Sequence, residues 1–225
     1  MGNSTSARPV AHIRPNRRVR ARLSKVANAR DTINGFGHDM DVVGLTFGQF
    51  SLIDLVQAVL EYTGPADVVV CTWSAGFYDV EAAERFRDNG ALRSIRFVMD
   101  SSVKRGQATV GEVGDIFGEE NVRATRTHAK FALITNSEWH CLITTSMNLN
   151  LNTRCEQFEL TDDAARAGMF MEFVDEVFGE LVEGDTGDRR LPILSGMQAV
   201  QPDLGIEIGE VKQVGKIRRI GGRRD

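Results

Sequence analysis

Five side chains with chemistry of their own fall within residues 127–160, a stretch that also contains apolar, strand-like runs. They supply an imidazole, an ammonium group, a hydroxyl, a carboxamide and a carboxylate: His128, Lys130, Ser146, Asn148 and Glu156. Lysine and asparagine can hold the non-bridging oxygens of a phosphoryl group, and histidine can act as a nucleophile or as a general acid and base. A carboxylate can bind the far ring nitrogen and set the tautomer, which is the role we expect of Glu156. The set predicts phosphoryl-transfer chemistry.

Strand geometry would bring these side chains together. Side chains alternate between the two faces of a strand, so His128 and Lys130 share a face if residues 128–134 are extended. Ser146 and Asn148 share a face in the same way on the next strand. A hairpin through residues 135–139 then places both pairs side by side. We therefore expect one concave patch that is lined by all four residues.

At these residues the sequence resembles the phospholipase D superfamily, whose signature is His-x-Lys-(x)4-Asp followed by Gly-Ser-x-Asn. The His-Ala-Lys segment at residues 128–130 matches the first part, and Thr-Ser-Met-Asn at residues 145–148 matches the second with threonine in place of glycine. Thr135 stands where the family has aspartate, and the gap to the second part is three residues longer. By strand parity position 135 points away from His128, so an aspartate there would brace the hairpin rather than contact phosphate.

The resemblance implies a phosphodiesterase that hydrolyses nucleic acid through a phosphohistidine. The chain carries one copy of the motif, and members of this kind resemble small nucleases that pair two subunits around one phosphate. The implied homodimer uses His128 of one subunit to attack phosphorus and His128 of the other to protonate the leaving oxygen. Lys130 and Asn148 of both subunits would stabilise the transition-state charge. Because lysines and imidazoles supply the positive charge, the resemblance implies no metal and no cofactor.

A second hypothesis stays open beside the enzymatic one. With Thr135 in place of the motif aspartate, the chain is also compatible with a catalytically weak or inactive phospholipase D-like protein that binds nucleic acid or an acidic assembly partner. An enzyme would form a phosphohistidine at His128. A binder would keep its affinity without His128 and lose it when basic segments are removed.

Basic residues concentrate at both ends of the chain, although the formal net charge of the whole is −4. Residues 1–30 carry eight Arg or Lys and no acidic residue, and residues 211–225 carry six with a single Asp. Such arms hold phosphate backbones because each neutralised phosphate releases counterions, but they can equally lie in solvent or dock on the acidic remainder of the chain. The candidate nucleic-acid contacts are Arg14, Arg17, Arg18, Arg20, Arg22, Lys216, Arg218 and Arg219.

Strand-like and helix-like patterns alternate between these ends. Apolar, β-branched runs predict strands at residues 41–47, 67–73, 94–99, 122–125, 128–134, 140–147 and 157–161. Apolar residues three to four positions apart predict helices at residues 51–62, 80–89, 108–117 and 162–181. This order indicates an α/β fold with a mixed, largely parallel β-sheet flanked by helices on both faces, similar to the phospholipase D fold. The predicted segments are a basic arm of residues 1–34, a phospholipase D-like domain of residues 35–184 and a basic tail of residues 185–225.

Composition excludes several other classes of protein. With 225 residues, 42% of them hydrophobic and 26% charged, the chain is typical of one large globular domain rather than of a disordered or collagen-like protein. The sequence has no run of about 18 apolar residues and no apolar secretory segment near its start, so we expect a cytoplasmic protein without a membrane partner. Its size and tails fit a bacterial or phage protein.

The three cysteines are an odd number in apolar, strand-like surroundings, which predicts reduced and buried thiols at Cys71, Cys141 and Cys155. A zinc site is disfavoured because His140 and Cys141 are neighbours on a predicted strand and point to opposite faces. The sequence also lacks the close Cys or His pairs that zinc sites use.

Overall fold

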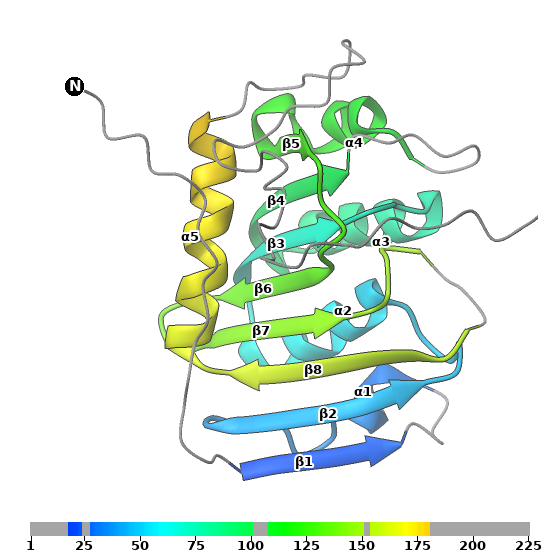
Figure 1. Cartoon of the computed structure of the whole chain (residues 1–225), viewed down its shortest axis with the longest axis vertical. Helices are drawn as coiled ribbons and strands as arrows, with labels where there is room; N and C mark the ends of the chain where they lie inside the picture. Colours follow the sequence, from blue (N-terminus) through cyan, green and yellow to red (C-terminus); the bar gives the residue numbers. More distant parts are fainter. Residues whose placement is uncertain (1–17, 24–27, 101–107, 151–153, 181–225) are drawn as a thin grey trace, which may run out of the picture.

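The computed structural model describes residues 18–23, 28–100, 108–150 and 154–180. Figure 1 shows a central sheet with helices on both sides. The strands are β1 Arg18–Leu23, β2 Met40–Thr46, β3 Ala66–Thr72, β4 Leu92–Asp100, β5 Val122–Thr125, β6 Phe131–Thr135, β7 His140–Thr145 and β8 Glu156–Asp162. The helices are α1 Ala29–Thr32, α2 Leu52–Thr63, α3 Phe77–Asp88, α4 Val110–Phe117 and α5 Ala164–Glu180, with a short 3-10 turn at Glu119–Asn121.

The strand order is β1-β2-β8-β7-β6-β3-β4-β5. The pairs β1–β2, β3–β4 and β4–β5 are parallel, and the other neighbours are antiparallel. Among the described strands six therefore run in one direction, and β6 and β8 run against them. The predicted mixed α/β sheet is confirmed. Although most of the described strands share one direction, only three of their seven pairings are parallel, because β6 and β8 each lie between two strands of the opposite direction. At one end of the strands, β3 and β7 finish beside the beginnings of β6 and β8 (Figure 1). We call this end of the sheet the cavity edge.

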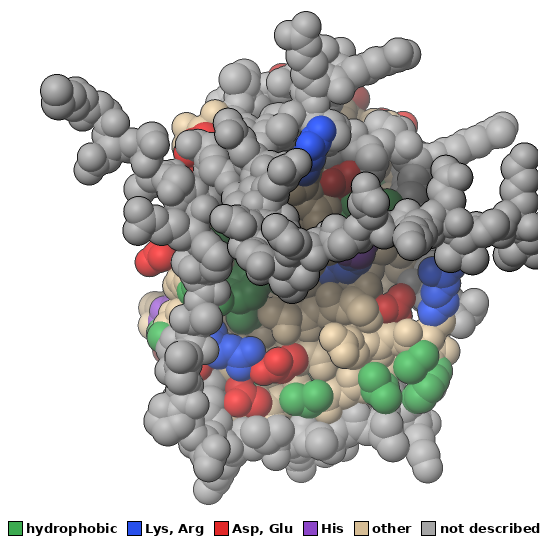
Figure 2. Space-filling view, viewed as in Figure 1, with side chains coloured by type: hydrophobic (Ala, Val, Ile, Leu, Met, Phe, Trp, Pro, Cys, Tyr) green, Lys and Arg blue, Asp and Glu red, His purple; other side chains and the backbone are tan. Residues whose placement is uncertain are grey.

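Helices pack on both faces of the sheet, as the apolar runs predict, although one face is covered only in part. Alternation within β6 shows how this arises, because Ala132 and Ile134 enter the core beneath α2, α3 and α4 while Phe131 and Leu133 face α5. The Phe131 ring packs edge-on against Phe170 of α5, with 4.9 Å between ring centroids. The α5 helix lies over β5, β6 and β7, and no other described helix covers the β2 end of this face. Figure 2 shows hydrophobic side chains along that end, where Val43 and Phe47 are 41% and 52% exposed.

Two segment boundaries differ from the sequence expectation. The strand predicted at residues 128–134 begins only at Phe131, because side chains bind the backbone before it: Asp100 Oδ2 accepts from Thr127 N at 3.0 Å and Thr127 Oγ1 accepts from Ala129 N at 3.1 Å. Residues 18–23, assigned to a basic arm, form β1 and pair with β2. The tail of residues 185–225 lies outside the described residues. No helix among those described is long and apolar enough to cross a membrane.

Candidate active site

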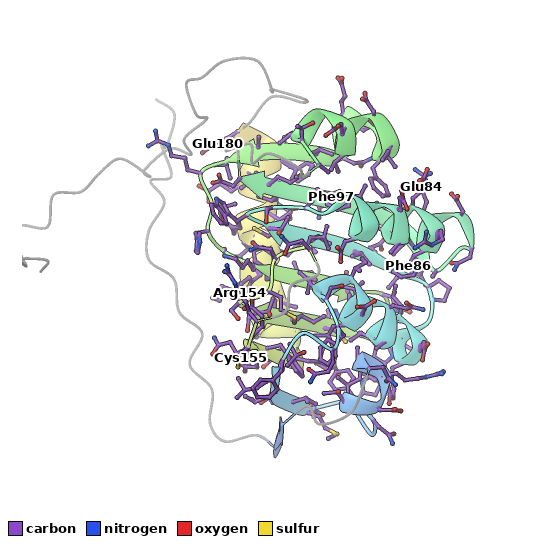
Figure 3. All side chains as sticks on the ribbon, turned by 90° about the vertical axis from the view of Figure 1, so that its right-hand side faces the viewer. Glu84, Phe86, Phe97, Arg154, Cys155 and Glu180 are labelled. Atoms are coloured by element: carbon purple, nitrogen blue, oxygen red, sulfur yellow. The ribbon has the colours of Figure 1, made fainter. Side chains whose placement is uncertain are left out.

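A cavity of about 650 Å³ opens at the end of the sheet where β3 and β7 finish and β6 and β8 begin. Five of its lining residues are the ones that the sequence singles out: His128, Lys130, Ser146, Asn148 and Glu156. The others are Trp73, Ser74, Thr145, Asn150, Arg154, Cys155 and Gln157. Figure 3 looks onto this edge and places Arg154 and Cys155 on the side of the sheet away from α2 and α3. The fold therefore brings the predicted set together around one hollow.

The segments after β3 and β7 are tied to each other across the start of β6. Leu149 N donates to Thr72 Oγ1 at 3.0 Å and to Ser74 O at 3.1 Å. Leu149 is fully buried in the core beneath α2, α3 and α4. Because neighbouring side chains in extended backbone point in opposite directions, burying Leu149 turns Asn148 and Asn150 toward the cavity. One buried leucine thus sets the orientation of two carboxamides.

His128 and Lys130 are in direct contact. Lys130 Nζ donates to the His128 carbonyl oxygen at 2.8 Å and lies 3.3 Å from His128 Nδ1. The imidazole is exposed, and its ring centroid is 5.3 Å from that of Trp73. Partial burial lowers the pKa of Lys130, and the nearby carboxylates of Glu156 and Asp100 only partly offset the lost hydration. The ammonium is therefore less well solvated than a surface lysine and is available to a bound anion.

Ser146 and Glu156 bind each other rather than His128. Ser146 Oγ donates to Glu156 Oε2 and accepts a hydrogen bond from Gln157 N at 3.0 Å. The contact predicted between Glu156 and His128 is absent, since the described contacts of the imidazole are with Lys130 and Trp73. The reason is the late start of β6, which leaves His128 in a loop directed toward the end of β3. Ser146 therefore braces the junction of β7 and β8.

The two asparagines carry unused hydrogen-bonding capacity. Asn148 makes no side-chain hydrogen bond to any described residue, and Asn150 Nδ2 donates to Ser74 Oγ at 3.4 Å. The Oδ1 atoms of both asparagines are buried without a partner among the described residues. Folded proteins normally satisfy such groups, so the cavity is the place where a bound group or water completes them.

Thr135 lies far from this cavity, at the opposite end of β6. It lines a separate hollow of about 400 Å³ together with Asn136, His140 and residues of α5. Five residues of extended chain, about 17 Å, separate it from Lys130. The departure from the family motif at position 135 therefore lies away from the imidazole, but the cause is distance along β6 and not strand parity, because His128 precedes the strand.

The cysteines divide into two buried thiols and one exposed thiol. Cys71 and Cys141 are buried, whereas Cys155 is exposed and lines the cavity, so the prediction of three buried thiols is wrong for Cys155. This residue precedes β8 instead of lying within it. Burial raises the pKa of Cys71 to about 12 and also raises that of Cys141. The described residues contain no group of three or more His, Cys, Asp or Glu that could hold a metal ion.

The predicted site residues do not include the whole lining. Trp73 and Ser74 directly follow β3, where the rule that ligands bind at the carboxyl ends of strands favours a place in the site. Arg154 and Cys155 precede β8 and belong to no motif. Of the predicted nucleic-acid contacts, Arg18, Arg20 and Arg22 belong to β1 at the outer edge of the sheet. Outside the described residues lie Arg14, Arg17, Lys216, Arg218 and Arg219.

No family model and no curated protein matches this chain. Among solved structures, the chain is similar to NucT from Helicobacter pylori, with 14% identity and a TM-score of 0.44 over 64% of this chain and 99% of NucT. It is also similar to the phospholipase D family member Nuc from Salmonella typhimurium, with 13% identity and a TM-score of 0.41 over 64% of this chain and 96% of Nuc. A third similarity is to polyphosphate kinase from Porphyromonas gingivalis, with 12% identity and a TM-score of 0.47 over 62% of this chain and 26% of the kinase. These similarities concern the path of the backbone.

Proposed function

We propose that this protein hydrolyses phosphodiester bonds in nucleic acid through a covalent phosphohistidine at His128. The observation that carries the proposal is one cavity lined by an exposed imidazole, an ammonium group 3.3 Å from it and the carboxamide of Asn148, which has no side-chain partner among the described residues. A nucleophile flanked by a cation and a neutral hydrogen-bond donor is the combination that an in-line attack on a phosphate diester requires.

In the proposed mechanism, Nε2 of His128 attacks phosphorus. Because Nδ1 faces Lys130 Nζ, Nε2 is the ring nitrogen left for the substrate. Its lone pair forms the P–N bond while the bond from phosphorus to the leaving oxygen breaks, and that oxygen takes up a proton. Water then attacks phosphorus and gives a proton to the group that protonated the leaving oxygen, the P–N bond breaks, and the neutral imidazole is restored. Lys130 and Asn148 stabilise the charge on the non-bridging oxygens.

In this mechanism the position of Lys130 decides whether Nε2 of His128 has a free lone pair. When a neutral imidazole accepts a hydrogen bond from the ammonium at Nδ1, its hydrogen resides on Nε2, and Nε2 cannot attack. The ammonium must therefore turn toward the phosphate before the imidazole can carry its hydrogen on Nδ1. An incoming phosphate draws the ammonium to itself by charge, so the substrate removes the block on its own attack.

The leaving oxygen needs an acid that the described part of one chain does not place in the cavity. His128 is the one imidazole among the lining residues, and the carboxylate of Glu156 is already held by Ser146. In the proposed homodimer, His128 of a second copy supplies the proton, and Lys130 and Asn148 of that copy add a second cation and a second hydrogen-bond donor around the phosphate. The basic ends of the sequence support nucleic acid as the polymer that is bound.

Replacing His128 tests the proposal. A single-stranded and a duplex substrate, each as DNA and as RNA, are incubated with the native chain and with His128→Ala, and we expect the variant to lose activity by about 1000-fold or more. His140→Ala, which removes an imidazole from the opposite edge of the sheet, is the matched control and should retain activity. Rapid denaturation at alkaline pH, where the P–N bond persists, should show a labelled fragment attached to the native chain only.

Two outcomes would overturn the enzymatic proposal. One is that no substrate is cleaved, and the other is that His128→Ala cleaves as fast as the native chain. If the chain cleaves nothing, binds nucleic acid equally well without His128 and loses affinity steeply with salt, it is the non-catalytic binder of the second hypothesis.

A further inference from the structure

The order of strands at the cavity edge gives the cavity two unlike ends. Going along the sheet in the order β8, β7, β6, β3, the lining passes from Arg154 before β8, through Asn148 and Lys130, to Trp73 after β3. Neighbouring strands lie about 4.8 Å apart, so these three spacings extend over about 14 Å. The side chains that bind the reacting phosphate in the proposed mechanism lie in the middle of this row. A guanidinium therefore lies toward one side of the reacting phosphate and an indole toward the other.

Trp73 lines the cavity and belongs to neither hydrophobic core cluster of the described residues. It is partly exposed, and it lies beside the proposed nucleophile with 5.3 Å between the ring centroids. Trp139, the other tryptophan of the chain, shows the structural alternative, because it is only 9% exposed and packs against Phe36 and His38. An indole left partly open beside a phosphate site is the arrangement that proteins use to stack a nucleic-acid base.

Polar groups next to Trp73 suit the edge of a base. Ser74 follows it directly, and its hydroxyl accepts from Asn150 Nδ2 at a long 3.4 Å. Asn150 Oδ1 has no partner among the described residues. The cavity volume of about 650 Å³ also lies within the range that holds drug-sized ligands, which is more space than a phosphate group alone needs. The end of β3 therefore offers an aromatic face together with a weakly satisfied hydroxyl and amide.

We propose that Trp73 stacks on the base of the nucleotide beside the reacting phosphate, so that the substrate is nucleic acid with unpaired bases. This inference rests on the proposed function and specifies its substrate class. Bases in a duplex are covered by their neighbours on both faces, and a base can reach the indole only when it is out of the stack. Arg154 at the other end of the cavity holds a neighbouring phosphate and is indifferent to the base.

The test compares two oligomers with the same number of phosphates, oligothymidylate and a chain of abasic tetrahydrofuran units. For the native protein we expect a KM for the abasic oligomer that is about 10- to 100-fold higher than for oligothymidylate. Trp73→Ala should abolish the difference in KM between the two oligomers, mainly by raising the KM for oligothymidylate. Trp73→Phe, which retains an aromatic face, should keep most of the preference, whereas Trp73→Leu, which retains bulk alone, should lose it. Arg154→Ala should weaken both oligomers alike.

A binding experiment gives a readout that does not depend on turnover. In His128→Ala, oligothymidylate should quench tryptophan fluorescence, and adding Trp73→Phe should remove the quench because Trp139 is buried away from the cavity. Two results would overturn the stacking proposal: equal KM values for both oligomers with the native chain, or an equal slowing of both by Trp73→Ala, which would assign Trp73 to positioning His128. Unimpaired cleavage by His128→Ala would instead contradict the proposed function and leave the stacking measurement standing.

Discussion

At the scale of single residues, the contact between Lys130 and His128 governs the chemistry. The Lys130 ammonium is held between the His128 carbonyl oxygen and Nδ1, and its charge is needed twice, first to attract the phosphate and then to stabilise the transition state. Its lowered pKa means that it loses this charge at a lower pH than an ordinary surface lysine does. Anion binding to the cavity should therefore depend on pH in the alkaline range.

We expect the affinity for tungstate, a stable dianion at alkaline pH, to fall as pH rises, and to do so at a lower pH than an ordinary lysine would cause, because the pKa of Lys130 is lowered. The ammonium is fully charged below its pKa and neutral above it, so binding is strongest at the low end of the range. Lys130→Arg should remove the fall, because a guanidinium stays charged. Calorimetric titration in a Cys155→Ser background excludes the charge of a nearby thiolate. An identical fall in the arginine variant would assign it to another group.

The thiols provide a residue-scale check of the cavity itself. With a chromogenic disulfide reagent at neutral pH, we expect Cys155 to react rapidly, while Cys71 and Cys141 react only on unfolding, because they are buried and their raised pKa values keep them protonated. Tungstate should slow the rapid phase, since Cys155 lines the same cavity as His128. The variant Cys155→Ser should have no rapid phase. A rapid phase that tungstate leaves unchanged would place the anion elsewhere.

At the scale of elements, the junction of β7 and β8 depends on Ser146. Its hydroxyl joins the Glu156 carboxylate to the backbone of Gln157, so Ser146→Ala leaves a partly buried carboxylate without that donor. We expect the free energy of unfolding in urea to fall by about 1 to 3 kcal/mol, with a lower kcat/KM because Asn148 shares the junction. Ser137→Ala, at an exposed turn, should change unfolding by less than about 0.5 kcal/mol. Unchanged stability with lost activity would show that Ser146 contacts the substrate instead of bracing the junction.

Hydrophobic periodicity predicts most elements because burial is what forms them. The strands β2 to β8 and the helices α2 to α5 all lie within a few residues of the predicted ranges, since each buries an alternating or helical apolar pattern. The exceptions have local or pairing causes. Asp100 and Thr127 bind the backbone ahead of β6 and delay its start. β1 is an edge strand whose Arg-rich sequence resembles an arm, and only its pairing with β2 shows that it belongs to the sheet.

The candidate site was predictable where its residues flank two neighbouring strands, and less so where they come from distant segments. His128, Lys130, Ser146 and Asn148 flank one hairpin, so short-range geometry brings them together. Trp73 joins them only because β3 pairs with β6, a pairing between strands separated by about sixty residues that no local pattern encodes. The hydrogen bond expected between Glu156 and His128 required both side chains to point toward each other. The loop before β6 turns His128 away, so Glu156 binds Ser146 instead.

At the scale of the whole molecule, the described chain presents a single motif at one open edge, and its proposed mechanism needs two. A monomer at micromolar concentration in sedimentation velocity would therefore contradict the homodimer and, with it, the source of the second imidazole. Association alone would not show that the subunits share a phosphate, because two copies can also pair with separate cavities. A measurement that counts the imidazoles used in each turnover distinguishes these two arrangements.

Mixing subunits provides that count. When native chains and His128→Asn chains are unfolded together and refolded in equal amounts, random pairing leaves both imidazoles intact in about one quarter of dimers. If attack and protonation come from different subunits, activity should fall to about one quarter of that of the native protein, and it should follow the square of the native fraction as the ratio is varied. A linear fall, to about one half at equal amounts, would mean that each chain completes the reaction with groups of its own. His140→Ala chains mixed in the same way should leave the activity per chain unchanged. The curvature of this titration therefore tests whether one phosphate is bound between two copies of the cavity.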